Sequence, residues 1–281
     1  MNFDKIKSYA KINLALNITG KTKYLHKIES IISFISLHDE IYIKQKNSKK
    51  HSINFYGKFS KNISADNTVF RLISLLEKKK LLKKKKFQIK IKKQIPNEAG
   101  LGGGSMNAAN ILKYFLKKKI IKVYKKEIIN ICRSIGSDVI LGLNPKNTIL
   151  NSKNEIKYFR NCAKFHVLIV KPNFGCSTKY IFSKVKKINK SKFQNPNKKM
   201  FKTDFLIKSN NLLEPIAFKK YPKLKSIKYY LENSLNPIFV RMTGSGSALV
   251  AYYNSKAMCK SAKIKFSQKY KNYWCIVSKT I

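Results

Sequence analysis

The chain has 281 residues, 43% of them hydrophobic, so it can bury one large core or two of medium size. No segment reaches the roughly 20 apolar residues of a membrane-spanning helix, and the first residues lack an apolar signal region, which leads us to expect a cytoplasmic protein without a membrane partner. Lys and Arg number 60 against 13 Asp and Glu, and the formal net charge of +47 predicts attraction for anionic ligands.

Strand and helix patterns follow one another through the first half of the chain. Alternating apolar residues predict strands over 11–18, 28–37, 40–46, 53–55 and 87–91. Helical spacing predicts helices over 67–76, 108–116 and 125–135. The last of these is expected to end at Gly136 in a left-handed cap, and the lysine-rich run 78–86 is expected to be a solvated helix end and turn.

The second half begins after a polar, weakly patterned region between residues 147 and 163, which indicates a boundary. Beyond it we expect strands over 165–170, 238–241, 248–253 and 273–278, helices over 223–235 and 256–270, and a mobile loop over 186–202. The regular βαβ repeat of a doubly wound sheet is missing. The pattern therefore predicts an α+β protein of two lobes, residues 1–157 and 158–281.

A glycine-rich loop joins the predicted strand at 87–91 to the predicted helix at 108–116. Four glycines in five positions (100–104) expose the backbone where a helix begins, and free N–H groups with the helix dipole suit a bound phosphate. The loop is not a Walker A motif, since no Gly-Lys-Ser/Thr closes it, and its glycine spacing excludes a dinucleotide fingerprint. The alternative is a flexible turn without a ligand.

Charge and cysteines allow further interpretations. The basic composition is compatible with a nucleic-acid binder, but lysine dominates and is spread over the whole chain together with Asn and Ile, as A/T-rich codons alone would produce. Five cysteines are scattered without metal-ligand spacing, so we expect reduced, mostly buried thiols.

Three separated motifs carry a family resemblance: Ala10–Leu16, Gly100–Ser105 and Arg241–Gly246. In this order they resemble the signature motifs of the superfamily named after galactokinase, homoserine kinase, mevalonate kinase and phosphomevalonate kinase. Within it, the segments 135–139, 171–178 and 211–215 are most similar to the 4-diphosphocytidyl-2-C-methyl-D-erythritol kinase family of the non-mevalonate isoprenoid pathway. The resemblance covers residues 8 to about 252.

The resemblance implies an N-terminal lobe with a left-handed crossover, like domain 2 of ribosomal protein S5, and a ferredoxin-like C-terminal lobe. It implies transfer from ATP, with Mg²⁺, to the tertiary 2-hydroxyl of the erythritol moiety. The family's catalytic pair corresponds to Lys11 and Asp138, where a carboxylate can accept the hydroxyl proton and an ammonium group can stabilise negative charge. Read without the motifs, Lys11 is one more surface lysine and Asp138 a loop residue.

The resemblance also assigns the remaining site residues. The triphosphate is expected on Pro96, Asn97, Glu98, Ala99, Gly100, Leu101, Gly102, Gly103, Gly104, Ser105 and Met106, with Ser105 a candidate Mg²⁺ ligand. The cytidine substrate is expected on Asn13, His26, Thr178, Phe182, Gly244, Ser245 and Gly246. His26 and Phe182 are assigned to the cytosine, although Phe182 also suits plain core packing.

The sequence departs from the family pattern in three places. Leu25 replaces the tyrosine that precedes the histidine, in a loop one residue shorter, and Tyr24 is the candidate to take its place. Ile140-Leu141-Gly142 follows Asp138-Val139 instead of proline and aromatics, and Met106 replaces a second serine. Two other functions stay open: another kinase of the superfamily, against which His26 and the segment 211–215 argue, and an RNA-binding protein of S5-like fold.

Overall fold

The structure, a computed structural model, describes residues 2–22 and 26–281. The chain forms two compact units, and neither is continuous in sequence. Unit 1 comprises Met1–Ala10, Leu37–Asn97 and Gly102–Pro145, and unit 2 comprises Lys11–Ser36, Glu98–Leu101 and Lys146–Ile281. The expected lobe boundary between residues 157 and 158 divides the chain only once, whereas the chain passes from one unit to the other at several points.

Two long strands carry chain from one unit into the other. β1 (Asp4–Lys21) and β2 (His26–Lys46) pair with each other, and both run past the residues at which the units divide. We expected separate strands over 28–37 and 40–46, and this was wrong. The polar residues His38 and Asp39 interrupt the apolar pattern without interrupting the strand, because Asp39 is buried and hydrogen-bonded.

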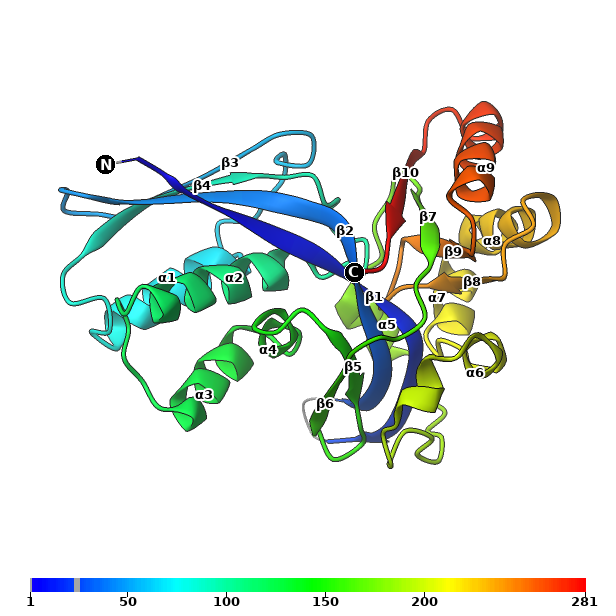
Figure 1. The fold of residues 1–281 in the computed structure, drawn as a ribbon, viewed down its shortest axis with the longest axis horizontal. Helices are drawn as coiled ribbons and strands as arrows, with labels where there is room; N and C mark the ends of the chain where they lie inside the picture. The colour runs from blue at the N-terminus through cyan, green and yellow to red at the C-terminus, as the bar shows by residue number, and fades with distance from the viewer. Residues whose placement is uncertain (1, 23–25) are drawn as a thin grey trace. The chain divides into compact units, whose positions relative to one another are not determined.

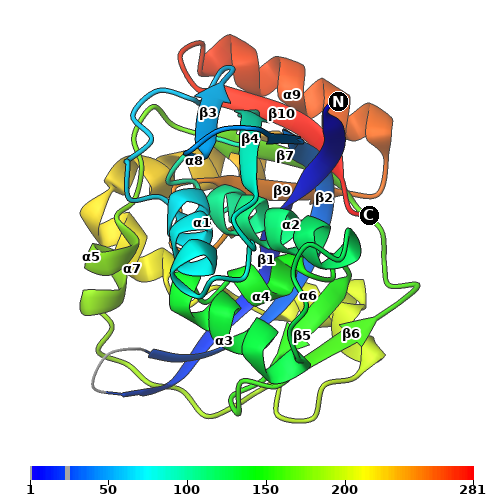
Figure 2. The same cartoon turned by 90° about the vertical axis from the view of Figure 1, so that its left-hand side faces the viewer.

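Unit 1 is a sheet covered by helices. The end of β2 pairs antiparallel with β4 (Lys86–Lys92), which pairs parallel with β3 (Ser52–Tyr56). The helix α1 (Thr68–Lys78) connects these parallel strands and is capped by the Asn67 side chain, which accepts hydrogen bonds from the N–H groups of Val69 and Phe70. Figure 1 shows α1 and α2 (Gly103–Lys117) along one face of this sheet, and Figure 2 shows them side by side in front of β3 and β4.

Two further helices complete unit 1. α3 (Lys125–Ile135) packs its apolar face into the same core, and the short α4 (Val139–Gly142) follows it. Gly136 ends α3 as expected, but not in a left-handed cap, which corrects that expectation. Its φ of 170° is extended backbone, which needs no glycine.

Unit 2 contains the ferredoxin-like lobe. Its sheet has the order β10-β7-β9-β8, with every neighbouring pair antiparallel, from β7 (His166–Lys171), β8 (Phe239–Met242), β9 (Leu249–Tyr253) and β10 (Trp274–Lys279). Helices stand between β7 and β8 and between β9 and β10, which gives the βαββαβ order of that fold.

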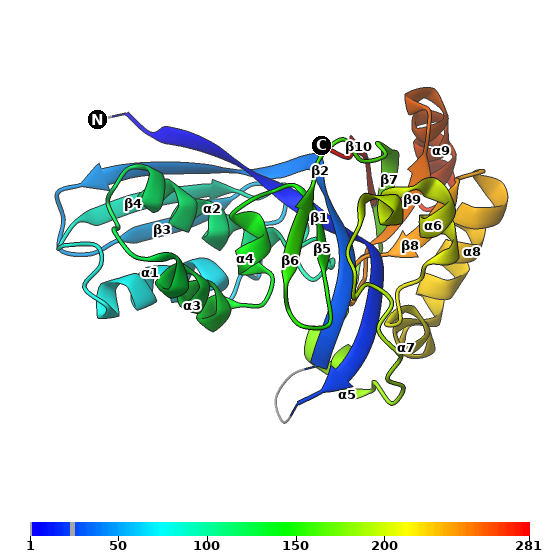
Figure 3. The same cartoon turned by 60° about the horizontal axis from the view of Figure 1, so that its bottom comes forward.

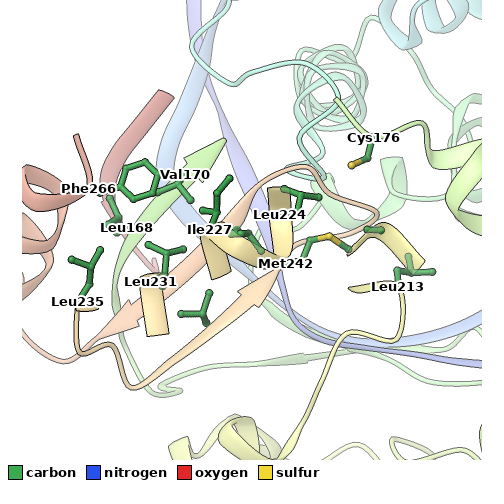
Figure 4. Close-up of a cluster of buried hydrophobic side chains, with 14 of the residues drawn as sticks. Leu168, Val170, Cys176, Leu213, Leu224, Ile227, Leu231, Leu235, Met242 and Phe266 are labelled. Carbon is green, nitrogen blue, oxygen red and sulfur yellow. The ribbon is translucent and has the colours of Figure 1, made fainter. Parts of the chain in front are cut away.

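The helices α8 (Pro222–Ser234) and α9 (Lys256–Lys269) cover one face of the unit 2 sheet. Figure 4 shows the core between these helices and the sheet, where Leu168 and Val170 of the sheet contact Ile227, Leu231 and other buried side chains. Three shorter helices lie between β7 and α8: α5 (Thr178–Ser183), α6 (Thr203–Lys208) and α7 (Glu214–Lys220).

The region expected to be a polar boundary is a hairpin in the structure. β5 (Asn147–Leu150) and β6 (Ile156–Phe159) pair antiparallel, and β5 pairs with residues 30–32 of β2, as Figure 3 shows. These four-residue strands were not predicted, because they lack a clear apolar run. The region 186–202 holds only a 3₁₀ helix (Lys198–Phe201) and is fastened by the buried carboxylate of Glu29, which accepts hydrogen bonds from the N–H groups of Lys192 and Phe193.

The C-terminal residues complete unit 2. β10 pairs with β7, and beyond it Thr280 bridges Ile35 of β2 in antiparallel fashion. The N–H of Ile281 donates to the carbonyl of Phe34 at 3.0 Å. Within the described residues, no helix has both the length and the apolar character that crossing a membrane requires.

Candidate active site

The first half of the glycine loop, residues 98–101, is bound through its carbonyls to the first and third sequence motifs within unit 2. These carbonyls accept hydrogen bonds from the N–H groups of Ser247, Ala248 and Lys11 at 3.0–3.3 Å, and from the hydroxyl of Thr243 at 3.1 Å. The three motifs, far apart in sequence, therefore meet through hydrogen bonds to the carbonyls of the loop.

Gly100 shows why this contact requires glycine. Its φ of +71° lies in the left-handed region, and a Cβ atom at this position would lie 2.0 Å from the carbonyl oxygen of Thr243. Gly244, with a φ of +54°, faces Gly100 from the other side, where a Cβ would lie 3.1 Å from the Gly100 Cα. The two backbones approach too closely for any side chain between them.

The second half of the loop begins α2 in unit 1. Gly102 is its N-cap in the left-handed conformation with φ 70°, and within the described chain no side chain caps this helix start. The N–H groups of Gly103, Gly104 and Ser105 lie in the first turn, which has no intrahelical acceptors for them. Such a helix start binds phosphate readily.

Met106 differs from the other residues assigned to the phosphates. Its side chain is completely buried, near the position that a Cβ of Gly142 would occupy, and its N–H donates to the carbonyl of Gly102 inside the helix. The structure thus gives Met106 a packing role and no polar group for a ligand.

Sequence reasoning missed Thr68, the first residue of α1. Its Oγ1 is buried and has no hydrogen-bond partner among the residues that the structure describes. It lies 3.0 Å from where a Cβ of Gly104 would stand, so the hydroxyl adjoins the glycine-rich start of α2. A threonine in a helical pattern gives no signal of this contact.

A buried charge pair holds the entry to the loop in unit 1. Asp39 is 0% exposed and forms a salt bridge with Lys93, which is 3% exposed. The same carboxylate accepts hydrogen bonds from the N–H groups of Gln94 and Ile95 at 2.7 and 2.8 Å and from the Asn107 amide at 2.9 Å. Asp39 thereby joins β2, the end of β4 and α2.

The predicted catalytic residue Lys11 lies in β1 and is 4% exposed, so it is no ordinary surface lysine. Its Nζ donates to Asn13 Oδ1 at 2.8 Å. The same oxygen accepts from Gly244 N at 2.9 Å, while Asn13 Nδ2 donates to Ser30 Oγ at 2.8 Å. The Asn13 amide therefore couples Lys11 to the turn of the third motif.

Asp138 is the N-cap residue of α4 in unit 1 and is half-buried. Lys11 belongs to unit 2, and the assignment of the two as a catalytic pair stays a prediction. Ser105, on the first turn of α2, has its Oγ 3.9 Å from where a Cβ of Gly136 would stand, so it lies near the segment that leads to Asp138 within the same unit.

The predicted substrate residues of unit 2 form two groups. Thr178, at the start of α5, shares a hydrogen bond with Ser245 at 2.9 Å between their hydroxyl oxygens. Gly246, with a φ of +87°, packs against Cys176, whose sulfur would lie 3.2 Å from an added Cβ.

The second group is an aromatic pair. His26, at the start of β2, and Phe182, in α5, have ring centroids 5.4 Å apart with an interplanar angle of 42°. Burial, with a smaller effect of Lys21, lowers the pKa of His26 and favours the neutral imidazole. Its Nε2 is buried without a hydrogen-bond partner in residues 2–22 and 26–281, so it is available to a ligand. The departures at Tyr24 and Leu25 lie outside the described residues.

The cysteines and the possible metal ligands of the described chain also bear on the sequence expectations. The five cysteines are free, and four are buried; burial raises the pKa of Cys132 and Cys176 to about 11 and that of Cys259 to about 12, which suits inert thiols. Nowhere in the described chain do three or more His, Cys, Asp or Glu side chains gather as metal ligands.

Comparison with known proteins identifies the family. A 4-diphosphocytidyl-2-C-methyl-D-erythritol kinase from Pelagibacter ubique is 56% identical over 281 residues, covering 100% of both chains. The chain belongs to the 4-diphosphocytidyl-2-C-methyl-D-erythritol kinase family. The family's enzyme from Petrotoga mobilis is 33% identical and covers 89% of this chain and 99% of its own, and the model of the GHMP kinases N terminal domain matches residues 67–145.

Solved structures agree on the fold. A crystal structure of 4-(cytidine 5'-diphospho)-2C-methyl-D-erythritol kinase superposes with a TM-score of 0.80 at 22% identity and covers 99% of each chain. Homoserine kinase from Cytophaga hutchinsonii follows with a TM-score of 0.72 at 14% identity, covering 100% of this chain and 95% of its own. The α+β fold expected from the pattern of strands and helices is confirmed.

Proposed function

We propose that this protein transfers the γ-phosphoryl group of ATP to the 2-hydroxyl of 4-diphosphocytidyl-2-C-methyl-D-erythritol, in the non-mevalonate route to isoprenoid precursors. The observation that carries the proposal is the full-length relationship, at 56% identity, to a kinase of that name. The geometry of unit 2 supports it, since the first motif, the glycine loop and the third motif are joined through Asn13, Thr243 and Gly100. A small-molecule alcohol and ATP are the partners, and we expect the enzyme to work in the cytoplasm.

Asp138 acts as the general base in this proposal. A tertiary alcohol is a poor nucleophile, so a carboxylate within hydrogen-bond reach accepts its proton as the O–P bond forms. The Lys11 ammonium stabilises the charge that develops on the transferred group. Asn13 helps to orient Lys11, because its Oδ1 accepts a hydrogen bond from the Lys11 Nζ at 2.8 Å.

The glycine loop binds the triphosphate. The N–H groups at the start of α2 and the helix dipole bind phosphate oxygens, and Thr68 Oγ1 is a further donor beside Gly104. Phosphoryl transfer depends mainly on positioning and charge stabilisation, which this backbone site supplies.

Mg²⁺ suits this site because the phosphates of the nucleotide supply ligands to it. Mg²⁺ usually keeps several waters and binds substrate phosphates with few protein ligands, so the absence of a carboxylate cluster in the described chain is compatible with it. Ser105, on the first turn of α2, is the residue that would hold it. When bound, the ion neutralises charge on the phosphates.

The cytosine binds at His26 and Phe182. The Phe182 ring offers a face for stacking, and the buried Nε2 of His26 lacks a partner in the described chain, so it can hydrogen-bond the edge of the base. Thr178, Ser245 and Gly246 lie in the same unit and are assigned to the rest of the substrate.

The proposal is tested by measuring ADP formation from ATP with three purified alcohols: the cytidine compound, homoserine and mevalonate. We expect turnover only with the cytidine compound, dependent on Mg²⁺. Turnover of homoserine without turnover of the cytidine compound contradicts the substrate assignment, and tight RNA binding without ATP turnover contradicts the kinase assignment.

A further inference from the structure

The segment 206–215, which we call the brace, lies wholly in unit 2 and contains the Asn-Leu-Leu-Glu-Pro motif of residues 211–215. From sequence, this motif argues for a pocket that binds the cytidine. In the structure its polar side chains instead bind the main chain of residues 242–244, at the third motif. The turn of that motif carries Gly244, Ser245 and Gly246, the residues assigned to the substrate.

Asn211 makes the central contacts of the brace. It is 1% exposed, and its Nδ2 donates to the carbonyls of Met242 and Gly244, both at 2.8 Å. Its Oδ1 accepts from the N–H of Leu213 at 3.0 Å. Both amide hydrogens are used, and they fix two carbonyls on either side of Thr243.

Two charged side chains reinforce this connection. Glu214 accepts a hydrogen bond from the N–H of Met242 at 2.7 Å and is itself paired with Lys228 at 2.6 Å. The buried Arg241 guanidinium donates back to the carbonyls of Leu206 and Ser209 in the brace. Residues 241 and 242, which lead into the turn, are therefore bound to the brace from both directions.

The brace also contacts the strand of the first motif. The N–H of Leu16 in β1 donates to the carbonyl of Asn210, and the N–H of Leu212 donates to the carbonyl of Leu16, both at 3.0 Å. Asn211 stands between these two contacts. The strand that carries Lys11 and Asn13 is thus bound to the backbone of Asn210 and Leu212, while the side chain of Asn211 between them binds the turn that carries Gly244.

We propose that Asn211 is a positioning residue for the phosphoryl acceptor, an inference that rests on the proposed function. It acts through the turn: when the carbonyls of Met242 and Gly244 are fixed, the Gly244 N–H donates to Asn13 Oδ1 at 2.9 Å, and the Ser245 and Thr178 hydroxyls share a hydrogen bond. Loss of the two amide donors leaves buried carbonyls unpaired and lets these peptide planes rotate. Asn13, which also binds the Lys11 ammonium, then loses a fixed partner.

The test is Asn211→Asp, which keeps the size of the side chain but places a carboxylate oxygen against two carbonyl oxygens. The matched control is Asn210→Asp, the same change at an exposed neighbour that binds Leu16 through its backbone carbonyl. We expect kcat/KM for the cytidine substrate to fall about 100-fold in Asn211→Asp, with KM for ATP within about threefold of wild type. Asn210→Asp should stay within about twofold.

The split between substrates separates positioning from general destabilisation. A loss that matches the fraction of unfolded molecules, or one shared equally by both substrates, overturns the proposal. Equal kinetics of folded Asn211→Asp and Asn210→Asp overturn it as well. If the wild-type protein does not phosphorylate the cytidine compound, the proposed function fails. The contacts of the brace are then tested by hydrogen exchange. The Gly244 N–H should exchange at least tenfold faster in Asn211→Asp than in the wild type, and an unchanged rate overturns the inference.

If Asn211→Asp does not fold, Asn211→Ala replaces it, since it removes both donors without adding charge. We expect about a 10-fold loss of kcat/KM for the cytidine substrate, again with KM for ATP nearly constant. Failure of both variants to fold would show that Asn211 holds unit 2 as a whole and would overturn its assignment as a positioning residue.

Discussion

Asn13 and Asn211 hold the turn of the third motif from two sides, Asn13 at the Gly244 N–H and Asn211 at the carbonyls of Met242 and Gly244. Both amides are buried and satisfied by several hydrogen bonds. A buried amide of this kind tolerates few replacements, because each lost bond leaves a polar group unpaired. The turn is therefore held by hydrogen bonds on both sides of Gly244, one of the residues assigned to the substrate.

At Asp138 the prediction concerns chemistry and not binding. Asp138→Asn keeps the shape of the side chain but removes the base, so turnover should fall by about 10²- to 10⁴-fold while KM for ATP changes only a few-fold. Steady-state kinetics with varied ATP check both values. Asp204→Asn, at an exposed residue of α6, is the matched control and should be nearly as active as wild type. An active Asp138→Asn enzyme contradicts the base assignment.

Residue types alone could assign some positions of the site and not others. The motifs were enough to select Lys11, Asn13 and Gly244, which the structure joins through one amide. Asp39 and Thr68 could not be recognised from the sequence. Lys93, the buried partner of Asp39, cannot be distinguished among so many lysines, and a threonine in a helical pattern has no distinctive feature. Met106 was placed with the loop, and only the structure shows its side chain in the core.

At the scale of elements, Asp39 connects β2 to the segment that follows β4 and to α2. The glycines only allow two backbones to approach closely, whereas the Asp39 carboxylate forms a salt bridge and hydrogen bonds with its neighbours. All of its described partners lie in unit 1. A buried charge pair of this kind contributes little when complete but is costly when one partner is removed.

Asp39→Asn should therefore lower the free energy of unfolding by about 3–5 kcal/mol, since it leaves the Lys93 ammonium buried without a counter-charge. Urea unfolding followed by circular dichroism measures this. The double variant with Lys93→Met should recover part of the loss. Asp66→Asn, at a surface pair whose carboxylate is 79% exposed, should change stability by less than about 1 kcal/mol. Equal effects of Asp39→Asn and Asp66→Asn would contradict the role given to Asp39.

Most elements with a clear apolar period were predictable, including β3, α1, α3, α8 and β9. Elements without such a period were not. The strands β5 and β6 span four residues each and carry polar side chains, and α6 and α7, with six and seven residues, are too short for a helical period to be recognised. The units are discontinuous because β1 and β2 each run from one unit into the other, and local patterns do not show where a single strand passes between units.

For the molecule as a whole, the net charge of +47 predicts an effect on substrate capture. A positive field speeds the encounter with anionic nucleotides, and salt screens it. Raising NaCl from about 50 to 300 mM should lower kcat/KM for the cytidine substrate several-fold and leave kcat nearly constant. Stopped-flow and steady-state kinetics check this, with sucrose as the uncharged control. A kcat/KM independent of salt would show that the lysines have no part in capture.

The pairing of β2 with the last residues of the chain has a consequence for biosynthesis. Phe34 and Ile35 find their partners in Ile281 and Thr280, and β7 finds one in β10. A ribosome therefore releases the apolar residues of the first hairpin long before these partners exist. Until residues 280 and 281 have been synthesised, the unpaired strand edge near Phe34 and Ile35 is open to aggregation and to chaperone binding.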